Sequence, residues 1–314
     1  MGKERRKGID RLIETKGAQS PAEDPRNRDL LIWLNGRLVR RAEALVSIFD
    51  AGFGLGDGVW EGIRLSHGRL VLVEDHLRRL YDGARTIAID IGLSPAEMRA
   101  ALDEVVVANR MHDGAHLRLM VTRGEKSTVH QDPRNAFGRP TIAITAEYKM
   151  PDPDLKRRGL KLATSTFRCS GPDVFDLRLN SHSRLNLIQA LLQAIAAGAH
   201  EALMLDPLGF VSSCNSTNFF IVRDGAVATS TGRFCFNGIT RAKVIELCER
   251  ERLACRQADF TLAQVYSADE AFVTGTFGGV TPVCSIDGRA IGGVVPGTLT
   301  LRLSRAYEEA YLSP

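Results

Sequence analysis

The chain has 314 residues, 44% of them hydrophobic and 25% charged, which excludes a disordered chain, a collagen and a coiled coil. Its length predicts about two domains, and no apolar run reaches the roughly 18 residues of a membrane-spanning helix. The net charge of +4 comes mainly from residues 1–28, where eight basic and five acidic side chains lie, so we expect no nucleic-acid partner.

The spacing of apolar residues predicts strands and two helices in the first half of the chain. Asn35-Gly36 lies between two apolar runs and predicts a hairpin, because both residues tolerate positive φ. Ser94-Pro95-Ala96-Glu97 predicts a helix start, with serine as the N-cap and proline at the first helical position. The expected elements are strands at 31–34 and 37–39, a strand pair within 63–73, helices at 74–91 and 95–109, and strands at 115–122 and 140–147.

A polar, proline-containing stretch at 150–154 predicts the domain boundary. Beyond it we expect strands at 160–167, 202–205, 219–222, 226–228 and 271–273, and helices at 183–198, 240–252 and 297–311. Strands and helices mix in both halves without a strict βαβ repeat, which favours an α+β fold. The expected organisation is a charged tail at 1–28, a smaller domain at 29–147, a linker at 148–156 and a larger domain at 157–314.

Local motifs leave the chemistry open. The glycine-rich run at 52–58 lacks the Lys-Ser/Thr of a nucleotide-binding loop, so a tight turn with positive φ is the plain interpretation. The histidines show no metal-ligand spacing, and no metal site is predicted. Six cysteines without a CxxC pair or a secretory leader predict a reduced, cytoplasmic protein.

Longer sequence blocks carry more information, and they follow one another over about residues 31–310. They are Trp33-Leu34-Asn35-Gly36, Asp57-Gly58-Val59-Trp60-Glu61-Gly62-Ile63-Arg64, His76-Leu77-Arg78-Arg79-Leu80, Thr122-Arg123-Gly124, Glu201-Ala202-Leu203-Met204-Leu205-Asp206, Asn218-Phe219-Phe220-Ile221-Val222, Asn237-Gly238-Ile239-Thr240-Arg241 and Thr274-Gly275-Thr276.

In this order the blocks resemble those of class IV aminotransferases, the fold-type-IV pyridoxal phosphate (PLP) enzymes. That family includes branched-chain and D-amino-acid aminotransferases and aminodeoxychorismate lyase. The resemblance implies a two-domain α+β fold with the cofactor cleft between the domains, PLP as cofactor and an amino acid or related amine as substrate. It also implies a homodimer, for which the apolar stretch Phe49–Trp60 is a candidate contact.

The resemblance also assigns the cofactor-binding residues. Arg79 resembles the arginine that binds the PLP phosphate, a role that suits a planar guanidinium. Gly238, Ile239 and Thr240 precede a helix and resemble the turn whose N–H groups meet the phosphate, and Thr276 and Phe277 resemble a second backbone cradle.

The loop at 122–131 resembles the substrate loop of the D-amino-acid enzymes. This resemblance makes Arg123 and His130 the candidate substrate contacts. The arginine that accompanies this histidine in the family is replaced by Thr128.

The chain departs from the family at the lysine that forms the Schiff base with PLP and then moves the Cα proton. Residues 176–186 contain no lysine. An ungapped alignment places Asn180 there, small gaps place Arg178 or Ser183 there, and Arg184 is a further candidate in the same stretch. His182 lies beside them and titrates near neutral pH, so it is a candidate for proton transfer.

A second departure is at Ser213, which takes the place of the family glutamate that pairs with the pyridine nitrogen. A hydroxyl cannot hold that nitrogen protonated as a carboxylate does. Three interpretations follow: a protein that binds PLP or pyridoxamine phosphate with modified chemistry, an enzyme for another phosphorylated or anionic ligand, or a non-catalytic binding protein on the same fold. We adopt the first, with the other two as alternatives.

Overall fold

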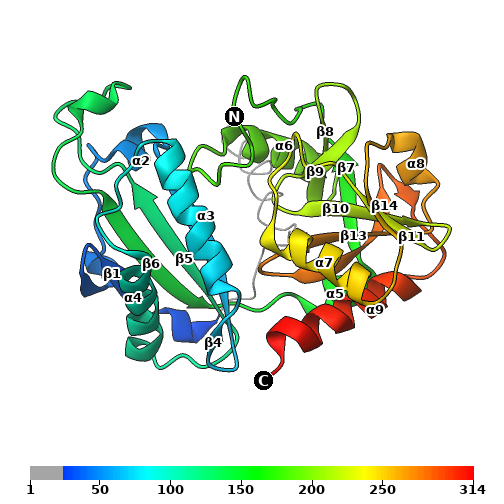
Figure 1. Cartoon of the computed structure of the whole chain (residues 1–314), viewed down its shortest axis with the longest axis horizontal. Helices are drawn as coiled ribbons and strands as arrows, with labels where there is room; N and C mark the ends of the chain where they lie inside the picture. Colours follow the sequence, from blue (N-terminus) through cyan, green and yellow to red (C-terminus); the bar gives the residue numbers. More distant parts are fainter. Residues whose placement is uncertain (1–23) are drawn as a thin grey trace, which may run out of the picture. The chain divides into compact units, whose positions relative to one another are not determined.

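The computed structural model of the chain describes residues 24–314, which form two compact units (Figure 1). The N-terminal unit contains the described residues up to Met150 together with residues 179–184 and 311–314. The C-terminal unit contains residues 151–178 and 185–310. The division after Met150 falls within the expected linker, 148–156, but two short segments of the expected larger domain lie in the N-terminal unit.

The expected charged tail lies outside the described residues as far as residue 23. In its last part, Pro25–Asn27 is a 3-10 helix, η1, which Asp24 caps. The Asn27 side chain then exchanges two hydrogen bonds with the backbone of Tyr148, at 2.9 and 2.8 Å. These contacts fix residues 24–28 to the N-terminal unit.

The N-terminal unit is built on a six-stranded antiparallel sheet in the order β2-β1-β6-β5-β3-β4. Its strands are β1 (Leu31–Leu34), β2 (Arg37–Arg40), β3 (Gly58–Ser66), β4 (Arg69–Leu70), β5 (Ala115–Thr122) and β6 (Thr141–Tyr148). Its helices are α2 (Ala51–Leu55), α3 (Val73–Thr86) and α4 (Pro95–Ala108), with 3-10 turns at Arg41–Glu43 and Pro133–Asn135.

Helices α3 and α4 cover one face of this sheet (Figure 1). Alternate residues of β5 are buried, and the core joins Leu117 and Leu119 of β5 to Leu77 and Leu80 of α3 and Leu102 of α4. The period of two along the strand turns the remaining residues of β5 to the opposite face of the sheet.

The C-terminal unit is built on a mixed nine-stranded sheet in the order β12-β11-β10-β13-β14-β7-β8-β9, with β15 on β14. Its strands are β7 (Leu160–Thr164), β8 (Glu201–Leu205), β9 (Val211–Cys214), β10 (Asn218–Arg223), β11 (Ala226–Thr229), β12 (Cys255–Gln257), β13 (Glu270–Gly275), β14 (Gly279–Ile286) and β15 (Arg289–Ala290). Its helices are α5 (Pro153–Arg158), α6 (Leu185–Ala196), α7 (Ile239–Arg250), α8 (Leu262–Tyr266) and α9 (Thr298–Tyr307), and a π-helical turn follows at Glu308–Leu312.

Both faces of this sheet are covered, as β8 shows. All five residues of β8 are buried. Leu203 belongs to the core that contains Phe219 and Val273, whereas Met204 packs with Ala190 of α6 on the other face. The pattern is that of a central strand, and the α+β fold class is confirmed.

The expected hairpin at Asn35-Gly36 is confirmed, since both residues have positive φ, 50° and 91°. Gly56 in the glycine-rich run also has positive φ, 68°, as expected for a tight turn, but residues 51–55 before it form the short helix α2. Across residues 24–314, the helices are too short or too polar to cross a membrane.

Candidate functional site

A carboxylate without solvent exposure lies at the centre of the N-terminal unit. Glu61 of β3 faces α3, where Arg79 donates to it twice, from Nε to Oε1 and from Nη2 to Oε2, both at 2.7 Å. His76 Nδ1 lies 2.6 Å from Oε2. Burial raises the pKa of Glu61, but the charge of Arg79 and the hydrogen bonds from Arg79 and His76 outweigh it and hold the pKa at about 2. Glu61 is therefore ionised, and it fixes one edge of the Arg79 guanidinium.

Residues 179–184 form an additional extended segment along the start of β3. The Trp60 N–H donates to the Asn180 carbonyl at 3.0 Å, and the His182 N–H donates to the Gly58 carbonyl at 2.9 Å. Between them, Val59 and Ser181 form an antiparallel bridge. Through this pairing, residues 179–184, where the lysine of the family was expected, belong to the N-terminal unit.

The four candidate positions in that stretch have different surroundings. Arg178 lies before the segment and pairs with Asp176 at 2.6 Å, as an exposed ion pair. The Asn180 amide is buried and donates to the Trp60 carbonyl at 2.5 Å and to Glu61 Oε1 at 3.3 Å. The Ser183 hydroxyl donates to a backbone carbonyl of the loop before β3, at 3.1 Å.

Arg184 is the fourth candidate, and its guanidinium lies 5.3 Å from the centre of the Trp60 ring. Arg118 of β5 lies over the same ring, 3.8 Å from its centre. Arg184 also donates from Nε to the Ser181 carbonyl at 3.0 Å and from Nη2 to Asn180 Oδ1. Burial, and then the charges of Arg118 and Arg79, lower the pKa of Arg184 to about 10, so it stays charged at neutral pH.

The sequence analysis missed Arg118 and Trp60. Trp60 lies in one of the family blocks but was assigned no role. Arg118 could have been found from the alternation of apolar and polar residues in β5. Leu117 and Leu119 face the core, so His116 and Arg118 face the other side of the sheet. Burial, followed by the charges of Lys149 and Arg118, lowers the pKa of His116 to about 3, so its imidazole is neutral at neutral pH.

His182 is a second neutral imidazole of this unit. Burial is the main cause that lowers its pKa below the ordinary value. Its Nε2 atom is buried and finds no hydrogen-bond partner among the described residues. The ring lies against Gly58, where an added Cβ would come within 2.7 Å of His182 Cδ2. The structure therefore leaves Nε2 as a buried polar atom whose partner is not among the described residues.

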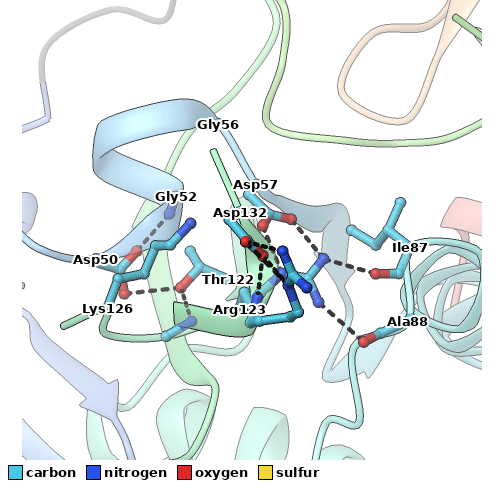
Figure 2. A network of polar contacts seen from close by, with 12 residues as sticks. Asp50, Gly52, Gly56, Asp57, Ile87, Ala88, Thr122, Arg123, Lys126 and Asp132 are labelled. Atoms are coloured by element: carbon cyan, nitrogen blue, oxygen red, sulfur yellow. Dashed lines mark hydrogen bonds and ion pairs between the residues drawn. The ribbon is translucent and has the colours of Figure 1, made fainter. Parts of the chain in front are cut away.

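Arg123, a predicted substrate contact, is held inside the N-terminal unit (Figure 2). Its guanidinium binds Asp57 at 2.6 and 3.0 Å, and it donates to the carbonyls of Ile87 at 2.7 Å and Ala88 at 3.0 Å. These four hydrogen bonds link three segments of the unit. They describe a structural tie, and the expected role of Arg123 in binding substrate stays a prediction.

His130, the other predicted substrate contact, lies on an exposed loop. Its Nδ1 accepts from the Asp132 N–H at 3.2 Å, and its carbonyl accepts from Nζ of the buried Lys126. Nearby, Asp50 caps α2 through the Gly52 N–H at 2.8 Å (Figure 2). This network orders the loop, and the role of His130 toward a substrate stays a prediction.

In the C-terminal unit, helix α7 begins without a side-chain cap. The N-cap residue, Gly238, donates its N–H to Asn218 Oδ1 at 3.2 Å, and an added Cβ would lie 2.4 Å from that oxygen. Thr240 in the first turn is buried. A helix start of this kind has N–H groups that can bind an anion.

The second expected cradle follows β13. Thr276 and Phe277 lie in the turn before β14, and the Phe277 side chain is buried. The Thr274 hydroxyl, at the end of β13, is buried without a hydrogen-bond partner among residues 24–314. Thr274 pairs in register with Asn218, the residue that holds Gly238. The two turns of this unit therefore present donor groups that suit a phosphate.

Ser213, at the position of the family glutamate, donates its buried hydroxyl to the Thr217 carbonyl at 2.8 Å. A buried carboxylate does occur nearby in the sheet, at Glu201, which accepts from the hydroxyls of Ser216 at 2.9 Å and Thr217 at 2.6 Å. Burial raises the pKa of Glu201 to about 7, and the sequence analysis gave it no role.

Together the fold and these groups define a class: a two-domain α+β protein with groups of the kind that bind phosphate. The family model for amino-transferase class IV matches residues 58–286, and the chain belongs to this family. The resemblance seen in the sequence blocks is thereby confirmed.

Known relatives fall within the same family. The chain is 37% identical over 286 residues to the branched-chain-amino-acid aminotransferase-like protein 1 of Arabidopsis thaliana, covering 91% of this chain and 51% of that protein. It is 35% identical to the D-alanine aminotransferase of Bacillus licheniformis, covering 90% and 97%. A solved branched-chain amino acid aminotransferase with pyridoxamine 5'-phosphate, of T.th. origin, has a TM-score of 0.85 and 31% identity, covering 90% and 94%. The chain thus spans about half the length of the Arabidopsis relative.

Proposed function

We propose that the chain binds PLP or pyridoxamine phosphate and acts on an amino acid or related amine, with chemistry modified by the absence of a lysine from residues 176–186. The observation that carries the proposal is the ion pair of Arg79 with the buried Glu61, which holds the expected phosphate ligand at a fixed orientation. The solved relative with pyridoxamine 5'-phosphate supports the cofactor class.

The donor groups of the structure fit a phosphate. In the N-terminal unit, Arg79 has a guanidinium of the kind that binds phosphate oxygens. In the C-terminal unit, the N–H groups of Ile239 and Thr240 at the start of α7 are donors of the same kind. Thr276 would contribute its N–H, and the Thr274 hydroxyl, which lacks a partner in the described part of the chain, would gain one. The expectation that the cofactor lies between the two domains stays a prediction.

When bound, the cofactor supplies the aldehyde or amine group and an electron-withdrawing ring. The residues of this chain would bind the substrate and move its proton. Arg118 carries a half-buried charge suited to a carboxylate, and His182 offers its Nε2 to a proton. The Ser213 hydroxyl would leave the ring nitrogen less strongly protonated than a carboxylate does.

The alternative is an enzyme or binding protein for another anionic ligand on the same fold. The charges of Arg118 and Arg79 both contribute to lowering the pKa of Arg184. A group of three guanidinium side chains binds carboxylates and phosphates in general. If the cofactor does not bind, the absence of a lysine from residues 176–186 favours this alternative.

We also propose a homodimer. Large apolar side chains before β3 are exposed, among them Leu45 at 78%, Ile48 at 67% and Phe53 at 74%. Contiguous exposed apolar residues of this kind mark association surfaces. Analytical ultracentrifugation at micromolar concentration should give twice the mass of one chain, and a monomeric mass would contradict the proposal. The cytoplasmic location stays a prediction.

Titration with pyridoxamine phosphate tests the proposed function. Wild-type protein should bind it, and Arg79→Lys should weaken binding about tenfold or more, because lysine retains the charge but cannot bind Glu61 and a phosphate with one planar group. Arg78→Lys is the matched control, since Arg78 is exposed and pairs with Asp75 at the surface. Equal affinities of the three proteins would remove Arg79 from the site. Binding of inorganic phosphate without pyridoxamine phosphate would favour the alternative.

A further inference from the structure

Two cysteine thiols meet where helix α7 ends in the C-terminal unit. Cys248 lies in the last turn of α7 without solvent exposure, and its thiol donates a hydrogen bond to the Cys255 sulfur. Cys255 is the first residue of β12 and is half-buried. Neither cysteine is in a disulfide. The structure therefore places two thiols in direct contact, one shielded from solvent and one partly open to it.

The turn between α7 and β12 explains this contact. Arg252, just after the helix, has a positive φ of 54°, and the Leu253 N–H donates to the Cys248 carbonyl at 2.8 Å. This combination is typical of a Schellman motif, which ends a helix and reverses the chain. Cys255 then pairs in register with Val227 of β11. Because residues 248 and 255 form no CxxC pair, the sequence analysis gave them no role.

A buried cation lies beside the two thiols. Arg241 is in the first turn of α7, and its Nη2 donates to the Gln257 side chain at 2.9 Å and to the Ser230 carbonyl at 2.7 Å. Gln257 and Cys255 share one face of β12, because side chains alternate along a strand. The Arg241 Nε is buried and has no hydrogen-bond partner within residues 24–314. The face of β12 that carries Cys255 therefore meets a positive charge on α7.

These contacts make the two sulfurs chemically different. The hydrogen bond from the Cys248 thiol lowers the pKa of Cys255, burial opposes this shift, and the charge of Arg241 adds to it. The same hydrogen bond, and then burial, raise the pKa of Cys248 well above its ordinary range. Cys255 is therefore the thiol that loses its proton first. The thiolate is the nucleophilic form of cysteine, and here it is also the more accessible of the two sulfurs.

We propose that Cys255 and Cys248 form a redox site at which a hydroperoxide oxidises the pair to a disulfide. The Cys255 thiolate attacks the peroxide, the O–O bond breaks, and a sulfenic acid forms on Cys255 while the other oxygen leaves as hydroxide or alkoxide. That leaving group takes the proton of Cys248.

The Cys248 sulfur then attacks the Cys255 sulfur, an S–S bond forms, and the hydroxyl group of the sulfenic acid leaves as water with a proton from solvent. In total the two thiols give up two electrons, and the hydroperoxide is reduced to an alcohol, or to water, and water. A dithiol reverses the oxidation by thiol–disulfide exchange. The inference uses no cofactor and is independent of the proposed function.

Peptide mapping of the wild-type chain tests the inference. The protein is treated with a small excess of hydrogen peroxide and digested without reductant. Trypsin cuts after Arg250 and Arg252, so the two cysteines fall in separate peptides, 244–250 and 253–256. We expect mass spectrometry to find these peptides joined by a disulfide, and the number of free thiols to fall by two from six. Dithiothreitol should restore both thiols. A chain in which these peptides stay separate, or in which another pair is joined instead, overturns the inference.

Single variants test which sulfur reacts first. In Cys248→Ser the hydroxyl can still donate to the Cys255 sulfur, but no second thiol is present, so the sulfenic acid should persist and form an adduct with a 1,3-diketone at residue 255. In Cys255→Ser no adduct should form at residue 248, and an adduct of equal yield there overturns the inference.

Cys284→Ser is the matched control for these variants. Cys284 is also half-buried, but its thiol donates to the Leu160 carbonyl at 3.3 Å. This variant should give the same joined peptides as wild type, and loss of the joined peptides would overturn the inference. The mapping of wild type needs no substitution, so it tests the inference even when a variant does not fold.

Discussion

Replacing Glu61 by glutamine should destabilise the N-terminal unit in a pH-dependent way. The folded-state pKa of about 2 lies below the ordinary value of 4.5. Glu61 therefore contributes stability above pH 4.5, and this contribution is lost as the pH falls from 4.5 toward 2. At about 1.4 kcal/mol for each pH unit, the pKa difference corresponds to about 3 kcal/mol.

At pH 7, Glu61→Gln leaves Arg79 without its buried counter-charge, and removal of one partner of a buried pair costs about 3–5 kcal/mol. As the pH falls from 4.5 to 2, the free energy of unfolding of wild type should fall by about 3 kcal/mol, a contribution that the variant lacks at every pH. The free energies of unfolding of the two proteins should therefore converge at low pH.

Urea denaturation followed by tryptophan fluorescence measures this difference. The chain has two tryptophans, Trp33 and Trp60, and both lie in the N-terminal unit, so the signal reports that unit. Glu74→Gln is the control, because Glu74 lies on α3, the helix that carries Arg79, but is exposed, with one contact to Arg99 at 3.2 Å. It should change little. A difference between wild type and Glu61→Gln that stays constant from pH 7 to low pH would refute the electrostatic reasoning.

Three further variants test other parts of the structure. Glu201→Gln should reduce the pH dependence of stability in the C-terminal unit. The folded-state pKa of Glu201, about 7, lies above 4.5, so the free energy of unfolding of wild type falls by up to about 3 kcal/mol as the pH rises through this interval. Urea unfolding followed by circular dichroism should show that the free energy of unfolding of the variant changes less with pH. Phe220→Ala removes a buried ring stacked on Phe272 at 4.8 Å and should cost about 3–5 kcal/mol in the same assay; a loss below about 1 kcal/mol would contradict it. Arg123→Lys should lower the free energy of unfolding by about 1–3 kcal/mol and leave pyridoxamine phosphate affinity unchanged. Weaker binding without a loss of stability would instead support Arg123 as a ligand contact.

The features that the sequence predicted well have local causes. The Asn35-Gly36 hairpin and the start of α4 at Ser94-Pro95 depend on residues within one turn of each other. The same reasoning was not extended to Asp152-Pro153, which was read as a linker. In the structure Asp152 caps α5 and Pro153 occupies its first position, as Ser94 and Pro95 do in α4.

The centre of the candidate site could not be predicted in this way. The contact of Asn180 with Glu61 joins residues 119 positions apart, and no local pattern indicates that residues 179–184 pair with β3. The sequence did identify Arg79, but its buried partner depends on the packing of α3 on β3. Arg118 was within reach, because the alternation of β5 separates it from the core residues.

The path of the chain has a consequence for biosynthesis. The N-terminal unit is assembled from three separate pieces, and the last is residues 311–314, where the Leu312 carbonyl accepts from the Ser66 hydroxyl of β3 at 2.7 Å. On the ribosome, β3 is made long before its partners at 179–184 and 311–314 emerge. The unit that appears first is therefore completed last, and a nascent chain that stops after residue 150 lacks the Asn180 contact to its buried carboxylate. Its final packing must wait until residues 311–314 have left the ribosome.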